Sequence, residues 1–227
     1  MTDDDKALRL ALAERLAASG HLRTDPWRAA VESVPRHEFL RSGYFERTDN
    51  PGPTAWRPVL PDDPGWLGGC YQDASLVTQI AGTIAPRDIR GEILREPTSS
   101  STLPGLVVRM LEDLQVEDGN PVLEIGTGTG YSTGLLCHRL GEDLVTSMEV
   151  DPEVSIRARA ALGHAGYAPF LITGDGLACM RGWSRPGPAG SSSPHCPAGS
   201  TPPNWPGSPS RRTGRPAAGS SAGRSHS

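Results

Sequence analysis

A strand, a glycine-rich loop, a helix and a second strand between Pro121 and Asp151 limit the fold of this chain most. The run from Pro121 to Ile125 is short and apolar, and Tyr131 to Leu140 has a helical pattern. A second apolar run extends from Leu144 to Val150. Short apolar runs that alternate with helices are typical of parallel strands in an α/β domain. The loop glycines stand at alternate positions: Gly126, Gly128 and Gly130.

The loop and the acidic residues around it predict a nucleotide-like ligand. Glycine has no Cβ, so the chain can turn sharply and a ligand can approach the backbone. The following helix N-terminus offers free amide hydrogens. Glu149 lies 23 residues after Gly126, close to the spacing expected for an acid that accepts both ribose hydroxyls. Glu124 places a carboxylate beside the loop, where the positive sulfonium of S-adenosylmethionine would be tolerated.

The spacing of the glycines favours S-adenosylmethionine over a nicotinamide dinucleotide. The dinucleotide motif GxGxxG needs glycine where this chain has Tyr131, which disfavours a nicotinamide-dependent oxidoreductase. A glycine-rich turn without any ligand is the structural alternative. Gly174-Asp175-Gly176 follows the apolar run Phe170 to Ile172, so Asp175 could meet the adenine, although such a triplet is more often only a turn. The predicted cofactor-binding residues are Glu124, Gly126, Thr127, Gly128, Gly130, Glu149, Asp175 and Gly176.

The N-terminal part is predicted to be a helical and irregular cap. Helical patterns cover residues 6–20 and a short stretch from Asp25-Pro26 to Val34. The many prolines of residues 48–68 predict an irregular loop without strand or helix, and Cys70 to Ile80 looks extended. Residues 82–100 are ambiguous. A helix over Pro104 to Leu114 is expected to present one apolar stripe made of Leu106, Val107, Met110, Leu111 and Leu114.

The last segment, Arg181 to Ser227, differs in kind from the rest. Pro, Gly and Ser make up 28 of its 47 residues, and it has no Val, Ile, Leu, Met, Phe or Tyr. Such a segment cannot bury enough apolar surface to offset its ordering entropy, so we predict disorder. It is either a genuine flexible extension or the product of a reading-frame shift. We favour the second, because the change is abrupt and falls inside an unfinished fold.

Charge and cysteine spacing bear on partners and location. The net charge of −4 argues against a nucleic-acid partner, which needs concentrated Lys and Arg. The first residues are acidic, unlike a secretory signal, and no long apolar stretch predicts a membrane span. No cysteine stands in a CxxC motif or a Cys/His cluster, so we expect no metal site and reduced thiols in the cytoplasm. The oligomeric state stays open.

Four segments, in this order, make the chain similar to the protein-L-isoaspartate O-methyltransferases. Tyr71 to Leu76 resembles the stretch before the family's substrate loop, and Ser100 to Pro104 lies where the family carries that loop. The segments are Val34 to Leu40 (VPRHEFL), Tyr71 to Leu76, Ser100 to Pro104, and Val122 to Tyr131.

The resemblance implies S-adenosylmethionine as cofactor and methyl transfer to the carboxylate of an isoaspartyl or modified aspartyl residue in a protein or peptide. The family's functional serine falls on Thr102, which keeps the hydroxyl and is the predicted catalytic residue. The neighbouring glutamine is Leu103 here, which weakens hydrogen bonding in the substrate loop. Alternatively, Ser99 to Thr102 is only a polar helix cap.

The expected architecture is an incomplete Rossmann-like α/β methyltransferase fold. We divide it into a cap over residues 1–100, a partial methyltransferase domain over 101–180 and the tail over 181–227. The stretch between Ile80 and Pro97 and the proline-rich loop with Asp62 to Leu67 resemble the actinobacterial branch linked to ATP-grasp peptide maturation. A ribosomal peptide is therefore an alternative substrate. Because the sheet looks unfinished, we expect weak or no activity. A catalytically inactive module that binds cofactor or peptide, and a product without a stable fold, are the alternatives from other classes.

Overall fold

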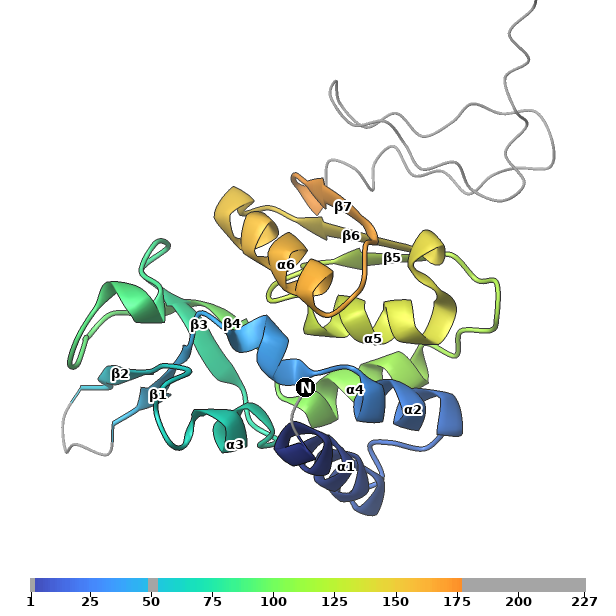
Figure 1. The fold of residues 1–227 in the computed structure, drawn as a ribbon. Coiled ribbons are helices and arrows are strands. Elements are labelled where there is room, and N and C mark those ends of the chain that lie inside the picture. The colour runs from blue at the N-terminus through green and yellow to red at the C-terminus, as the bar shows by residue number, and fades with distance from the viewer. Residues whose placement is uncertain (1–2, 49–52, 177–227) are drawn as a thin grey trace, which may run out of the picture.

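The computed structural model, which describes residues 3–48 and 53–176, contains two sheets of different kinds, one at the left of Figure 1 and one at the upper right, with most of the helices beneath the second. One is antiparallel with strand order β2-β1-β3-β4, and the other is parallel with order β5-β6-β7. The helices are α1 (Asp3–Ala18), α2 (Asp25–Ser33), α3 (Trp66–Cys70), α4 (Pro104–Asp113), α5 (Tyr131–Leu140), α6 (Pro152–His164) and the 3-10 helices η1 (Arg36–Leu40), η2 (Pro86–Asp88) and η3 (Glu142–Leu144). The strands are β1 (Tyr44–Arg47), β2 (Trp56–Val59), β3 (Leu76–Ile80), β4 (Pro97–Ser101), β5 (Val122–Ile125), β6 (Val145–Glu149) and β7 (Phe170–Thr173).

The parallel sheet has its strands at the three apolar runs and the predicted helix α5, whereas α6 was not predicted from the sequence. Its register pairs Val122 with Val145 and Thr146 with Phe170, so the carboxyl ends of all three strands lie at one edge. The connecting helices α5 and α6 cover the same face (Figure 1). β6 is buried along its whole length, as expected for the middle strand of a parallel sheet.

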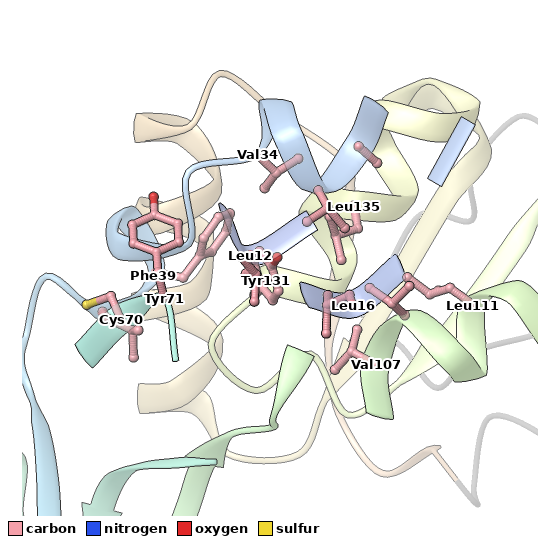
Figure 2. Close-up of a cluster of buried hydrophobic side chains, with 14 of the residues drawn as sticks. Leu12, Leu16, Val34, Phe39, Cys70, Tyr71, Val107, Leu111, Tyr131 and Leu135 are labelled. Carbon is pink, nitrogen blue, oxygen red and sulfur yellow. The ribbon is translucent and has the colours of Figure 1, made fainter. Parts of the chain in front are cut away.

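One hydrophobic core joins helices from both sides of the predicted boundary at residue 100. α1 contributes Leu12 and Leu16, α4 contributes Val107 and Leu111, and α5 contributes Leu135; all are buried (Figure 2). These helices therefore support the parallel sheet from below, as drawn in Figure 1. Cap and cofactor segment share this core, so loss of one helix would loosen both.

The cap contains a sheet of which the sequence predicted only β3, within the extended stretch Cys70 to Ile80. Residues 48–68 were expected to lack regular structure, and this is wrong: β2 covers Trp56–Val59, and α3 starts at Trp66. Pro58 is tolerated because β2 is the outer strand, where a missing amide hydrogen breaks no inner ladder. α3 likewise corrects the expectation that the chain is extended from Cys70 onward, since regular β3 begins only at Leu76.

Residues 81–96 connect β3 to β4 and complete a second, smaller core. Their apolar side chains pack against Phe45, Val77 and Ile80 of the antiparallel sheet. Trp56 pairs with Ile93 through an isolated bridge. This part of the chain is therefore folded against β1 and β2. The packed side chains are Ile84, Ile89 and Ile93.

The expected apolar stripe of α4 is only half right. Val107, Val108 and Leu111 are buried. Leu106, Met110 and Leu114, at intervals of four residues, are exposed. Packing against α1 and α2 selected the buried face, which apolar content alone could not do on a helix that is apolar on both sides. The prediction for residues 181–227 lies outside the described residues.

Candidate functional site

The carboxyl edge of the parallel sheet brings three loops together. The amides of Gly126 and Thr127 donate to the Met148 carbonyl at 2.7 and 3.1 Å, so the glycine-rich loop turns across the end of β6. The amide of Gly174 donates to the Glu149 carbonyl at 2.8 Å from the β7 side. This edge is where α/β folds bind their ligands.

The glycine-rich loop has the backbone that its sequence predicts. Gly126 has φ +90 and Gly130 has φ +92, both in the left-handed region that side chains disfavour. A Cβ on Gly130 would also lie 3.3 Å from Leu162, so the loop packs tightly against α6. Beside Gly126, by contrast, a Cβ would meet no atom within 4 Å. The loop therefore leaves open space at its outer side.

Glu149 ends β6 directly beside this loop. Its carboxylate accepts hydrogen bonds from the amides of Gly128 at 2.9 Å and Asp151 at 3.1 Å, one on each oxygen. A carboxylate oxygen can accept more than one hydrogen bond, so both retain acceptor capacity. The residue is thus held in place by the backbone and can still accept two hydroxyls, as the predicted ribose contact needs.

Glu124 is turned into the protein, beneath the loop. Its carboxylate accepts hydrogen bonds from the hydroxyls of Ser132, Thr133 and Ser147 at 2.5, 2.5 and 2.6 Å. Burial raises the pKa of Glu124 despite these three hydrogen bonds. The carboxylate therefore ties β5 to α5 and β6. Its predicted contact with the cofactor stays a prediction.

The remaining predicted cofactor residues lie at the same edge. The Thr127 hydroxyl is buried and hydrogen-bonds to the Ser147 hydroxyl at 2.7 Å, so a ligand would meet the Thr127 backbone. Asp175 is exposed, and Gly176 lies so close to β5 that a Cβ would be 2.8 Å from Ile125. A side chain at this position would require Ile125 to shift.

Thr102 reaches this edge from the antiparallel sheet. β4 ends at Ser101, and the Ser101 hydroxyl lies 3.5 Å from that of Thr129 in the glycine-rich loop. The Ser100 carbonyl is 4.0 Å from the Cβ position of Gly128. Thr102 follows directly and is exposed. The predicted catalytic residue and the predicted cofactor loop are therefore neighbours, although more than twenty residues separate them.

Comparison with known proteins bears on what this arrangement is. The family model for protein-L-isoaspartate (D-aspartate) O-methyltransferase matches residues 78–191, half of the chain. The chain belongs to this family. The predicted family is thereby confirmed, and with it the incomplete Rossmann-like α/β fold.

Individual members give the extent of the match. The Methanopyrus kandleri protein-L-isoaspartate O-methyltransferase is 29% identical over 182 residues, which are 78% of this chain and 63% of that protein. Protein-L-isoaspartate O-methyltransferase 2 of Archaeoglobus fulgidus is 38% identical over 178 residues, covering 78% and 62%. A solved protein-L-isoaspartate O-methyltransferase structure superposes with TM-score 0.53 at 26% identity, covering 75% of this chain and 43% of that one. The chain spans less than two thirds of the length of these relatives.

Sequence reasoning missed the residues that hold Thr102 in this methyltransferase family member. The Arg36 guanidinium donates to the Thr102 carbonyl at 3.2 Å. Ser75 accepts the Leu103 amide at 3.1 Å, and Asp73 accepts the Gly105 amide at 2.7 Å. These three residues lie inside two of the segments that carry the family resemblance, which was the available signal. Their partners could not be read from it.

A second link joins the two sheets near Glu149. Gln79 of β3 is buried and donates from its amide nitrogen to Asp151 at 3.3 Å, while its amide oxygen accepts the Thr98 hydroxyl at 2.9 Å. Asp151 also accepts the Glu153 and Val154 amides at the start of α6. Although burial opposes it, these hydrogen bonds lower the pKa of Asp151, so the cap of α6 is ionised.

No group of three or more His, Cys, Asp or Glu is placed to hold a metal ion within residues 3–48 and 53–176. No helix in those ranges is long and apolar enough to cross a membrane. His37 hydrogen-bonds to the Tyr71 hydroxyl, and His138 hydrogen-bonds to that of Tyr167, so each histidine has a structural contact.

Proposed function

We propose that this chain binds S-adenosylmethionine at the glycine-rich loop and methylates the carboxylate of an isoaspartyl residue in a protein or peptide. The supporting observation is that the two residues before exposed Thr102 lie beside Gly128 and Thr129 of the glycine-rich loop. Glu149 lies at the same edge and accepts the Gly128 amide. One strand comes from each sheet, so a cofactor and a polypeptide could approach this point from different sides.

The residues at the edge fit the cofactor. Open space outside Gly126 leaves room for a ligand along the backbone, and Glu149 keeps acceptor capacity for two ribose hydroxyls. The exposed carboxylate of Asp175 would accept from the adenine amino group, and Gly176 lets the chain pass close by. Glu124 would act from below by holding the loop between β5, α5 and β6.

The chain's own residues would contribute positioning more than acid–base chemistry. A carboxylate is already nucleophilic at neutral pH, so the reaction needs no general base. When bound, the cofactor would supply a methyl group on a positively charged sulfur, for transfer to the substrate carboxylate. The Thr102 hydroxyl would orient the accepting carboxylate by a hydrogen bond, and closure against the loop would exclude water.

Two measurements test the proposal in order. Calorimetry with S-adenosylmethionine and S-adenosylhomocysteine tests binding, and methyl incorporation into an isoaspartyl peptide, with the matching aspartyl peptide as control, tests the reaction. Thr102→Val should lower turnover with little change in cofactor affinity, while Thr102→Ser should retain turnover. Binding without turnover would support the inactive binding module instead. The absence of both cofactor binding and turnover would refute the proposal.

A second candidate substrate is a ribosomal peptide under maturation. The observation that favours it is the 81–96 segment, which packs its isoleucines on the antiparallel sheet and leads into β4, the strand that ends just before Thr102. An unmodified aspartyl peptide methylated faster than the isoaspartyl peptide would favour this candidate. We place either reaction in the cytoplasm, a proposal supported by the free thiols of buried Cys70 and Cys137.

A further inference from the structure

Arg36 is the most completely buried charged side chain next to the site. It belongs to η1, its exposed fraction is 0%, and it forms no ion pair with a carboxylate among residues 3–48 and 53–176. Backbone carbonyls solvate it instead. One terminal nitrogen donates to Cys70 and Gln72 at 2.9 Å each, and the other donates to Ala74 at 3.1 Å and Thr102 at 3.2 Å.

This geometry uses the shape of the guanidinium as well as its charge. The planar fork directs its terminal N–H groups at two chain segments at once, 70–74 and the Thr102 loop. A lysine ammonium donates from a single point and could not reach all four carbonyls. Burial lowers the pKa of Arg36, but a guanidinium stays protonated in proteins, so the cation persists and keeps its acceptors in place.

The same guanidinium also faces the cofactor side. Its central carbon lies 5.7 Å from the centre of the Tyr131 ring, within the range of a cation–π contact. Tyr131 is the first residue of α5 and follows the glycine-rich loop directly. η1 contacts both α3 and α6, and in Figure 1 it lies between the two sheets. Arg36 therefore touches both elements whose separation sets the distance between acceptor and methyl donor.

Segment 70–75, whose carbonyls bind Arg36, in turn binds the residues that follow Thr102. Ser75 and Asp73 accept the amides of Leu103 and Gly105, on either side of Pro104. Thr102 itself is bound through its carbonyl, so its hydroxyl is left for a substrate. The loop is thus held at three backbone points by one buried arginine and the segment that this arginine organises.

We propose that Arg36 is a positioning residue that holds Thr102 against the glycine-rich loop, and that it governs capture of the accepting carboxylate and leaves cofactor binding largely unaffected. This rests on the function proposed above. It assigns to Arg36 a role through Thr102 and none in contact with substrate or cofactor. The distinction matters because replacing a merely structural arginine would weaken the binding of cofactor and of peptide substrate together.

The experiment compares the full chain with three variants. Arg36→Lys keeps the charge and removes the fork. Arg41→Lys is the matched control, since Arg41 is exposed, follows the same 3-10 helix and pairs with Glu38 away from the site. Ser75→Ala frees the Leu103 amide without disturbing the buried cation. For each, we would measure amide hydrogen exchange, the Kd of S-adenosylhomocysteine, and KM and kcat for an isoaspartyl peptide.

In Arg36→Lys, exchange at the Leu103 and Gly105 amides should rise at least about tenfold, while exchange at the Gly128 amide stays within about twofold. KM for the peptide should rise about tenfold or more as the Kd changes less than about threefold, with Arg41→Lys like wild type. The proposal would be overturned if hydrogen exchange rose equally at all three amides or did not change. It would also be overturned if the affinity for S-adenosylhomocysteine and the peptide KM worsened in parallel.

Two outcomes distinguish failure of the Arg36 proposal from failure of the proposed function. If the wild-type chain transfers no methyl group, the proposed function fails, and the exchange comparison alone decides whether Arg36 positions the loop. If Arg36→Lys does not fold, Ser75→Ala takes its place: the peptide KM should rise about threefold, the worth of a weak exposed hydrogen bond, at constant Kd. An unchanged KM would then count against the proposal.

Discussion

Replacing Glu124 with glutamine separates its structural contacts from its predicted contact with the cofactor. The carboxylate accepts three hydroxyls, from Ser132, Thr133 and Ser147. A glutamine side chain offers one acceptor oxygen and an amide that only donates, so at least one hydroxyl must rotate or lose its acceptor. Taken alone, each hydrogen bond to a charged group is worth about 1.5–3 kcal/mol.

Burial of the charge works against that gain. Because burial raises the pKa of Glu124 above its usual value of 4.5, the three hydrogen bonds do not fully compensate desolvation. The folded protein therefore binds a proton more readily than the unfolded chain, and wild-type stability falls as pH rises from 4.5 through the raised pKa. Glutamine is neutral throughout and removes this slope.

The expected free energies follow from the two effects together. Near pH 5, Glu124→Gln should lower the free energy of unfolding by about 1 kcal/mol, the worth of one hydrogen bond. The difference from wild type should shrink toward pH 8. Glu124→Ala should cost about 2–4 kcal/mol, since Thr133 and Ser147 are fully buried and their hydroxyls would lose this acceptor. Urea titrations at several pH values measure the free energy of unfolding of the wild type and of both variants.

The same variant tells whether Glu124 also meets the methyl donor. S-adenosylmethionine is positively charged at sulfur and S-adenosylhomocysteine is not. A carboxylate about 8 Å from the sulfonium would contribute roughly 2 kcal/mol at an effective dielectric constant near 20, or about thirtyfold in affinity. Because the carboxylate is turned toward three hydroxyls, we expect both ligands to change equally. A selective loss of S-adenosylmethionine binding by about tenfold or more would refute this reasoning.

Three further perturbations have defined outcomes. Glu149→Gln should weaken S-adenosylmethionine and S-adenosylhomocysteine alike by roughly tenfold, the loss of a charged acceptor, as measured by calorimetry. Phe39→Ala should lower the free energy of unfolding by about 3–5 kcal/mol in urea, because this buried ring packs on Tyr131 with ring centres 5.8 Å apart. Burial lowers the pKa of His37 below 6.5 despite neighbouring Glu38, so wild-type stability should fall as pH drops below 6.5, and a His37→Gln variant should lack that slope.

The parallel sheet could be predicted well because its signals are local. The strands β5 and β6 end within a residue or two of the apolar runs, and α5 has the predicted bounds Tyr131–Leu140. Glycine at positive φ, apolar alternation and an acidic strand end each act within a few residues. The cofactor side of the site needs little more than these.

Apart from β3, the antiparallel sheet could not be predicted, because pairing across the chain decides it. β1, Tyr44–Arg47, has a short and mixed sequence that becomes a strand only between β2 and β3. β2 carries Pro58, which argues against a strand unless its position at the outer edge is known. β4 is a run of serines with no apolar alternation. Its place follows from pairing with β3.

The two sheets share no strand, and this explains why the Thr102 side of the site was harder to predict from the sequence than the cofactor side. Their polar links are single side chains: Gln79 to Asp151 at 3.3 Å, Ser101 to Thr129 at 3.5 Å, and Arg36 between Thr102 and Tyr131. The first two are long hydrogen bonds, each worth little on its own. Most of the restraint therefore falls on the buried arginine, which in the sequence is one charge among 22 basic residues.

It follows that damage to the antiparallel sheet should be felt first at Thr102. β4 carries the loop, β3 carries Gln79, and segment 70–75 carries the acceptors for the Leu103 and Gly105 amides. The glycine-rich loop and Glu149 are built within the parallel sheet and its own helices. Cofactor affinity and acceptor capture should therefore vary independently across substitutions in the antiparallel sheet, which sets the second and leaves the first nearly unchanged.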